Sequence, residues 1–139
     1  MRLTAFTDFG LRVLMVLAGD PGRSFTTAEI AGAFGISRNH LTKVVAALAQ
    51  AGFVATQRGQ GGGFRLARPA DELRLGDVIR HLEAGQPLVE CFRADGGACR
   101  LAPDCRLRHR LAAGWAAFLA ELDRTTLAQC TADLPGAAR

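Results

Sequence analysis

Hydrophobic residues recur every three or four positions over most of this 139-residue chain, which predicts a mainly helical protein. The first such stretch predicts a helix that ends near Ala18, before the turn-forming residues 20–22. Its apolar positions include Phe9, Leu11, Leu14 and Leu17. Thr7 or Asp8 is expected to cap this helix, because short polar side chains accept hydrogen bonds from the free amides of a first turn.

Two further helical patterns follow, separated by the short segment 34–36. Thr26 and Glu29 have the spacing of a capping box, which predicts the start of the first helix. Ser37 is expected to cap the second helix, which ends at Gly52. The inner face of that second helix is predicted to consist of Leu41, Val44, Val45 and Leu48. Two helices joined by so short a turn predict a helix-turn-helix.

Residues 53–57 and 64–68 are short strand candidates on either side of a glycine-rich segment, 58–63. Glycines at such a tip allow the positive φ angles of a hairpin. A helix-turn-helix followed by a basic hairpin predicts a winged helix-turn-helix, that is, a mainly α fold with a small β-hairpin wing.

The last third of the chain predicts two more helices, one over residues 73–85 and a long one from about Cys105. The long helix has one continuous apolar stripe, formed by Leu107, Leu111, Trp115, Phe118 and Leu122. A small winged helix offers little surface to bury it, so we expect it to pair with the same helix of a second subunit; the alternative is packing on its own domain. The predicted organisation is a DNA-binding domain over 1–85, a cysteine-containing loop over 86–105, and a dimerisation helix with a tail over 106–139.

Charge is distributed unevenly between the halves of the chain. Residues 1–70 contain eight basic and three acidic residues, and residues 71–139 contain nine and ten. No acidic residue lies between Glu29 and Asp71. A basic segment in an otherwise balanced chain indicates a polyanionic partner such as DNA, although an ordinary solvated face is the alternative.

The winged helix places particular polar residues where they can contact double-stranded DNA. The first turns of a recognition helix meet base edges or phosphates in the major groove, and a wing reaches phosphates or the minor groove. The candidate DNA-binding residues are Ser37, Arg38, Asn39, His40 and Lys43 on the helix, and Arg58 and Arg65 beside the hairpin tip.

Cys91, Cys99 and Cys105 lie within fifteen residues, and a fourth cysteine, Cys130, lies near the end. The chain shows no secretory signal and no apolar run of membrane-spanning length, so a cytoplasmic location is expected. Clustered cysteines in that compartment favour metal or redox chemistry over structural disulfides. Three thiolates are one short of a closed zinc site or a four-cysteine iron–sulfur site, so zinc, a cluster and free thiols all remain open.

Enzymatic chemistry finds little support in the sequence. The glycine-rich segment 58–63 lacks the Gly-Lys-Ser/Thr ending of a phosphate-binding loop. The chain offers no evident nucleophile–base pair and no pair of carboxylates suited to acid–base catalysis. We therefore expect a regulator rather than an enzyme.

Several of these segments together resemble the cluster-binding winged-helix regulators, a family that includes the nitric-oxide-sensitive repressor NsrR and the cluster-assembly regulator IscR. The resemblance runs almost end to end, over LTAFTDFGLRVLMVLA (3–18), GISRNHLTKVV (35–45), RGQGGGFRLARPADELRLGDVIRHLE (58–83), the three cysteines, CRLRHRL (105–111) and AAFLAELDRTTLAQC (116–130). The details FTDFGLR and SRNHL favour the NsrR-like branch.

The resemblance implies a homodimeric repressor that binds operator DNA and is released when nitric oxide attacks its iron–sulfur cluster. In NsrR-like members the three cysteines hold a 4Fe–4S cluster and an aspartate of the other subunit supplies the fourth ligand; the matching residue is Asp8. IscR-like members instead use a 2Fe–2S cluster and a histidine, for which His109 is the fallback. The segment 95–97 is an insertion that lengthens the loop, and Cys130 is expected to be a free thiol.

Overall fold

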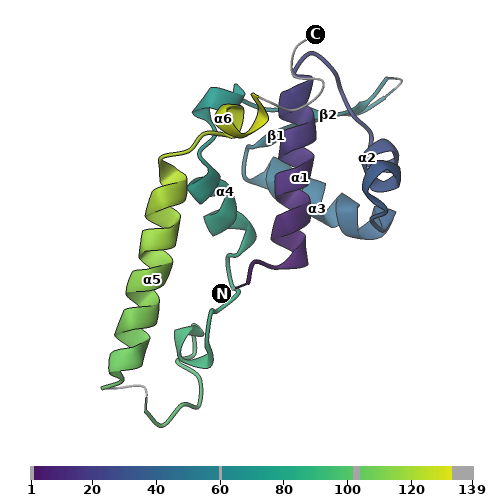
Figure 1. The fold of residues 1–139 in the computed structure, drawn as a ribbon. Coiled ribbons are helices and arrows are strands. Elements are labelled where there is room, and N and C mark those ends of the chain that lie inside the picture. Colours follow the sequence, from purple (N-terminus) through teal and green to yellow (C-terminus); the bar gives the residue numbers. More distant parts are fainter. Residues whose placement is uncertain (1, 60, 102–103, 133–139) are drawn as a thin grey trace.

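A computed structural model describes residues 2–59, 61–101 and 104–132 (Figure 1). Its α-helices are α1 (Ala5–Gly19), α2 (Thr27–Phe34), α3 (Arg38–Gln50), α4 (Leu75–Leu82), α5 (Arg106–Asp123) and α6 (Leu127–Thr131). Two strands, β1 (Val54–Gln57) and β2 (Gly63–Leu66), and two short 3₁₀ turns, η1 (Ala70–Glu72) and η2 (Glu90–Phe92), complete the described part. Within that part, every helix is too short or too polar to span a lipid bilayer.

The core lies where α1 crosses α3, with α4, α6 and the hairpin packed around this pair. The inner face predicted for α3 is confirmed, because Leu41, Val44, Val45 and Leu48 are all buried. Leu14 and Leu17 of α1 face the same core, at 0% and 1% exposure. Burial of this continuous apolar surface drives the helix-turn-helix to form.

Local capping fixes the starts of α2 and α3 as predicted. The amide of Glu29 donates to the Thr26 hydroxyl, and the Glu29 carboxylate accepts from the Thr26 amide at 2.7 Å. These hydrogen bonds lower the pKa of Glu29. Ser37 caps α3, with the His40 amide donating to its hydroxyl.

The cap predicted for α1 is wrong. The helix begins three residues earlier than Asp8, and Thr4 is its N-cap, accepting from the amide of Thr7 at 3.2 Å. The Thr4 amide and hydroxyl both donate to the Glu83 carboxylate at the end of α4, which fixes Thr4 at the helix start. Thr7 is fully buried inside the helix, and Asp8 is left free of any capping role.

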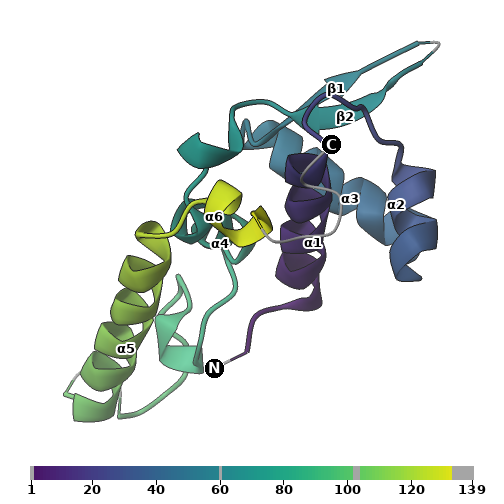
Figure 2. The same cartoon turned by 45° about the horizontal axis from the view of Figure 1, so that its top comes forward.

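The wing is an antiparallel hairpin in which Val54 pairs with Leu66 and Gln57 with Gly63. It extends away from the helices (Figure 2). Strand β2 is attached to the segment before α2, because the Phe25 amide donates to the Phe64 carbonyl and the Phe64 amide donates to the Phe25 carbonyl. A side chain at Gly63 would meet the Phe25 carbonyl oxygen at 2.6 Å, so this close approach requires glycine.

The long helix α5 leaves this core and packs mainly on α4. Arg80 of α4 forms a bidentate ion pair with Asp123 of α5, and these hydrogen bonds lower the pKa of Asp123. Leu119 is the single buried residue that α5 contributes. The predicted stripe is therefore left partly exposed by one chain, with Leu107 63% exposed.

After α5 the chain returns to the core through α6, which the sequence pattern did not predict. Leu127 is 0% exposed, and α6 packs against α1. Thr126 and Gln129 form a second capping box at its start. This Thr-x-x-Gln spacing was the available signal, but a five-residue helix is too short to show helical periodicity.

Candidate functional site

The start of α3 is exposed to solvent, as a recognition helix requires. Ser37, Arg38, Asn39 and Lys43 are exposed, and all four lie in or just before its first two turns. Among the described residues, neither Arg38 nor Lys43 forms an ion pair. These cations are available to an anionic partner such as the DNA backbone.

His40 lies at the same end of α3 but is directed toward α1. Its ring centre is 5.1 Å from that of Phe9, edge to face, and 6.1 Å from that of Phe6, stacked. These contacts favour a packing role, in which His40 sets the position of the recognition helix relative to α1. The contact of His40 with DNA stays a prediction.

The wing places two cations beside its tip. Arg58 directly follows β1, and Arg65 lies on β2 opposite Ala55. Both are exposed, and neither forms an ion pair within the part of the chain that the structure describes. The basic residues of the wing and of α3 thus lie on neighbouring elements without acidic partners.

The cysteine loop, residues 86–105, lies at the end of α5 that is distant from α6 (Figures 1 and 2). Cys91 lies in η2, Cys99 lies in the following loop, and Cys105 is the N-cap residue of α5. All three are half-buried, and all four cysteines of the chain are free thiols. Within the described residues of one chain, no group of three or more His, Cys, Asp or Glu side chains is arranged to hold a metal ion.

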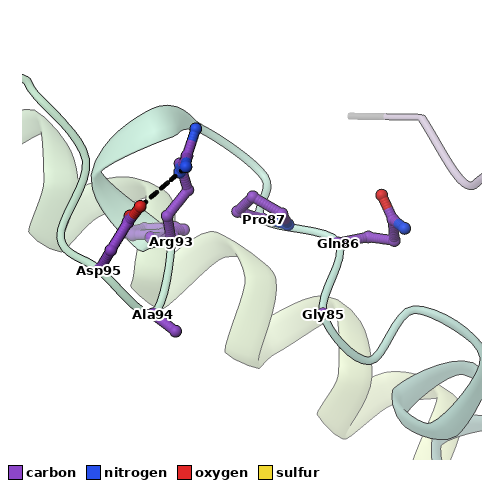
Figure 3. A pocket seen from close by; sticks show the side chains of 7 residues that line it. Gly85, Gln86, Pro87, Arg93, Ala94 and Asp95 are labelled. Carbon is purple, nitrogen blue, oxygen red and sulfur yellow. Dashed lines mark hydrogen bonds and ion pairs between the residues drawn. The ribbon is translucent and has the colours of Figure 1, made fainter.

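A hollow of about 690 Å³ separates the start of this loop from its first turn. Residues 85–87 form one wall, and Phe92, Arg93 and Asp95 form the other (Figure 3). The ion pair between Arg93 and Asp95 closes the turn on that side.

Asp8 lies on the exposed side of the first turns of α1. Its carboxylate pairs with Arg12 one helical turn later, at 2.8 Å, and both side chains are about half exposed. One chain does not bring Asp8 into a ligand group with the cysteines. The predicted role of Asp8 as a ligand to a partner's cluster is compatible with this position and stays a prediction.

Two other candidates lie near opposite ends of α5. His109 is exposed in the first turns of α5, four residues after Cys105. Cys130 lies on α6, at the opposite end of α5 from the cysteine loop (Figure 1). That separation supports the expectation that Cys130 is not a ligand.

A contact that joins α1 to α2 could not be read from the sequence. The guanidinium carbon of Arg12 lies 5.8 Å from the centre of the Phe34 ring, over its face. Phe34 is 37% exposed at the end of α2, where a core role would bury it more fully. An exposed aromatic residue beside an arginine-bearing helix was the only signal, and it is a weak one.

Comparison with known proteins identifies the class of regulator. Residues 3–133 match the family model Rrf2, described as an iron-dependent transcriptional regulator. The chain belongs to the Rrf2 family. Rrf2 regulators bind DNA, typically as dimers, so the predicted DNA-binding regulator is confirmed and an enzyme is excluded.

Solved Rrf2-like structures share the fold over nearly the whole chain. Staphylococcus aureus CymR in its oxidized form is 26% identical, with a TM-score of 0.75 over 97% of this chain and 99% of that one. CymR of B. subtilis, named as its global cysteine regulator, is 26% identical, with a TM-score of 0.76 and the same coverage. IscR of T. potens is 24% identical, with a TM-score of 0.75 over 100% of this chain and 92% of that one, which supports the fold alone. The predicted winged helix is confirmed.

In this Rrf2 chain, replacing Arg58 with alanine should weaken binding to every DNA sequence by a similar factor. A wing cation that contacts phosphate releases one counterion, so the slope of log affinity against log salt should become shallower by about one. Fluorescence anisotropy over a range of salt concentrations measures both quantities. Arg124→Ala, a change at the exposed residue that directly follows α5, is the matched control. An effect confined to one base position would show instead that Arg58 contacts a base edge directly.

Proposed function

We propose that this protein is a homodimeric repressor that nitric oxide releases from its operator DNA. Its operator affinity depends in this proposal on a 4Fe–4S cluster. The cluster is held by Cys91, Cys99 and Cys105 of one subunit and by Asp8 of the partner subunit. The observation that carries the proposal is the set of three half-buried free thiols in one loop, between a winged helix and an exposed dimerisation helix. The donor set fits such a group, because iron–sulfur clusters are bound by thiolates and one carboxylate completes four ligands. When bound, the cluster supplies iron that reacts with nitric oxide.

Asp8 is free to act as a ligand because the fold does not depend on it. Thr4 caps α1, and among the described side chains the Asp8 carboxylate forms hydrogen bonds and an ion pair only with Arg12. An exposed pair of this kind contributes about 0–1 kcal/mol, so exchanging Arg12 for another partner costs little. A carboxylate is also a harder and weaker ligand for iron than a thiolate, which makes this position the one most easily lost.

The helix that carries Asp8 also contacts both helices of the DNA-binding motif. Arg12 lies over Phe34 of α2, and Phe9 lies against His40 at the start of α3. A change in the position or pairing of Asp8 therefore acts on residues adjacent to the recognition helix. This arrangement supports a repressor in which the sensor alters the spacing of two half-site contacts in the dimer.

Replacing Asp8 with alanine should give a protein that binds its cluster weakly and loses most of its response to nitric oxide. The three thiolates remain, whereas the ligand expected to react first is absent. Anaerobic absorption spectra followed during nitric oxide titration and during exposure to a chelator measure both effects. Asp71→Ala, which removes an exposed carboxylate from η1, serves as the control. An unchanged response in Asp8→Ala would exclude Asp8 as the sensing ligand.

The proposed function is tested on the full chain purified without oxygen. The protein should be coloured, and its iron and sulfide contents should correspond to one cluster per subunit. Nitric oxide should then weaken operator binding about a hundredfold, which corresponds to about 2.7 kcal/mol of coupling free energy. Colourless protein that contains stoichiometric zinc would overturn the proposal.

An IscR-like regulator with a 2Fe–2S cluster is the second candidate, and the position of His109 favours it. His109 is exposed in the first turn of α5, four residues after the N-cap residue Cys105. Two irons per subunit and loss of the cluster in His109→Ala would support this alternative. Four irons per subunit and a normal cluster in His109→Ala would support the NsrR-like function.

A further inference from the structure

The segment between the first two cysteines is closed by a long-range hydrogen bond of its own. The Ala98 amide donates to the Glu90 carboxylate at 3.1 Å, across eight residues. Glu90 directly precedes Cys91, and Ala98 directly precedes Cys99. This hydrogen bond therefore joins the immediate neighbours of two predicted ligands.

A second set of contacts folds the turn inside this closed segment. The Asp95 carboxylate accepts from Arg93 at 2.7 and 3.0 Å and from the Gly97 amide at 3.0 Å. The Arg93 hydrogen bonds hold the pKa of Asp95 below its usual range. These contacts lie on one wall of the hollow seen in Figure 3.

Gly97 provides an independent steric constraint on the same closure. Its φ angle is +62°, and a side chain there would meet the Glu90 carbonyl oxygen at 2.7 Å. The backbone at residue 97 thus lies directly against the backbone at residue 90. Only glycine combines the positive φ with this close approach.

We propose that Glu90, Asp95 and Gly97 are positioning residues that hold the thiols of Cys91 and Cys99 as a preformed pair before any metal ion binds. The closure removes most of the chain entropy that two ligands eight residues apart would otherwise lose on binding. The inference depends on the proposed function only in taking iron as the natural occupant.

The pair can be measured without any metal, in a Cys105→Ser, Cys130→Ser background that retains only Cys91 and Cys99. In a glutathione buffer, the thiols of Cys91 and Cys99 give up two protons and two electrons and form one disulfide. One molecule of oxidised glutathione accepts these protons and electrons and becomes two molecules of reduced glutathione. The equilibrium constant is the effective concentration of one thiol at the other. We expect this value to be at least about tenfold higher in the folded protein than in urea.

Three variants and one control in that background separate the contributions. Glu90→Ala removes the carboxylate that accepts from Ala98 and should lower the effective concentration about fivefold. Glu90→Gln keeps an accepting oxygen and should stay close to the parent. Gly97→Ala should lower the value at least as much as Glu90→Ala, because the backbones at residues 90 and 97 must separate. Glu121→Ala, an equivalent change at an exposed residue of α5, should have no effect.

The inference would be overturned if the effective concentration in the folded parent protein equalled that in urea. It would also be overturned if the effective concentrations in Glu90→Ala and Gly97→Ala equalled that of the parent. In the full chain, Glu90→Ala should also contain less iron after anaerobic purification than Glu121→Ala. If the thiol pair forms as expected but the full chain contains no iron, the proposed function fails while the positioning role stands. The two failures are therefore distinguishable.

Discussion

Replacing Cys105 with serine is expected to remove the iron–sulfur cluster and to weaken operator binding about a hundredfold. A hydroxyl is a poor ligand for iron compared with a thiolate, so one of the three cysteine positions is lost. The fold should be retained, because Cys105 is the N-cap of α5 and its side chain makes no capping hydrogen bond. Serine is a preferred N-cap residue, which makes this substitution favourable for the helix itself.

Iron and sulfide analysis, visible absorption and operator binding at one fixed salt concentration test this expectation. Cys130→Ser is the matched control, since Cys130 is also half-buried but lies on α6. The control should keep both the cluster and the wild-type affinity. A Cys105→Ser protein with a normal cluster, or a Cys130→Ser protein without one, would contradict the proposed ligand set.

Replacing Trp115 with aspartate should convert the proposed dimer into a monomer at micromolar concentration. The Trp115 ring stacks on Phe118 with centres 5.3 Å apart, and one chain leaves this pair half exposed on α5. A two-fold interface contains every substituted residue twice. Losing two buried tryptophans should raise the dimer dissociation constant at least about a thousandfold, or about 4 kcal/mol. Operator affinity should fall with it, because a monomer contacts one half-site.

Analytical ultracentrifugation and operator titration measure the two effects. The control is Ala120→Asp, which adds the same charge on the opposite, exposed face of α5. Both variants keep Leu119 and the Arg80–Asp123 pair, so circular dichroism should show the helix content of the wild type in each. A Trp115→Asp protein that remains dimeric would show that the interface lies elsewhere.

Features set by neighbouring residues could be predicted from the sequence. The Thr26–Glu29 capping box and the Ser37 cap involve residues three apart, so their spacing alone identifies them. The inner face of α3 follows from helical periodicity. The hairpin follows from the glycines between two short apolar segments.

Features set by residues that are far apart along the chain could not be predicted from the sequence. Thr4, Thr7 and Asp8 are all acceptable caps, and the contact of Thr4 with Glu83, 79 residues away, decides among them. His40 carries a polar ring on a recognition helix, yet Phe6 and Phe9 on another helix determine where it lies. Sequence spacing carries no information about such contacts between elements.

The candidate site was likewise predictable from the sequence only in its local features. The three thiols and their placement before α5 follow from the sequence, whereas the arrangement of ligands does not. One chain assembles no metal-binding group among its described residues, and the predicted fourth donor belongs to a second subunit. Glu90 was missed because its partner lies eight residues away, beyond any capping or helical spacing.

The return of α6 to the core has a consequence for how such a protein can be divided. The Leu75 amide donates to Thr125, and the Leu127 amide donates to Leu73, so the end of α5 and the start of α6 are held beside the start of α4. Residues 83–124, which comprise the cysteine loop and α5, leave instead from the far end of α4, a helix that belongs to the core through Val78 and Leu82. A linker that replaced them would therefore have to span the length of α4, about 12 Å for eight residues, to leave the DNA-binding module whole.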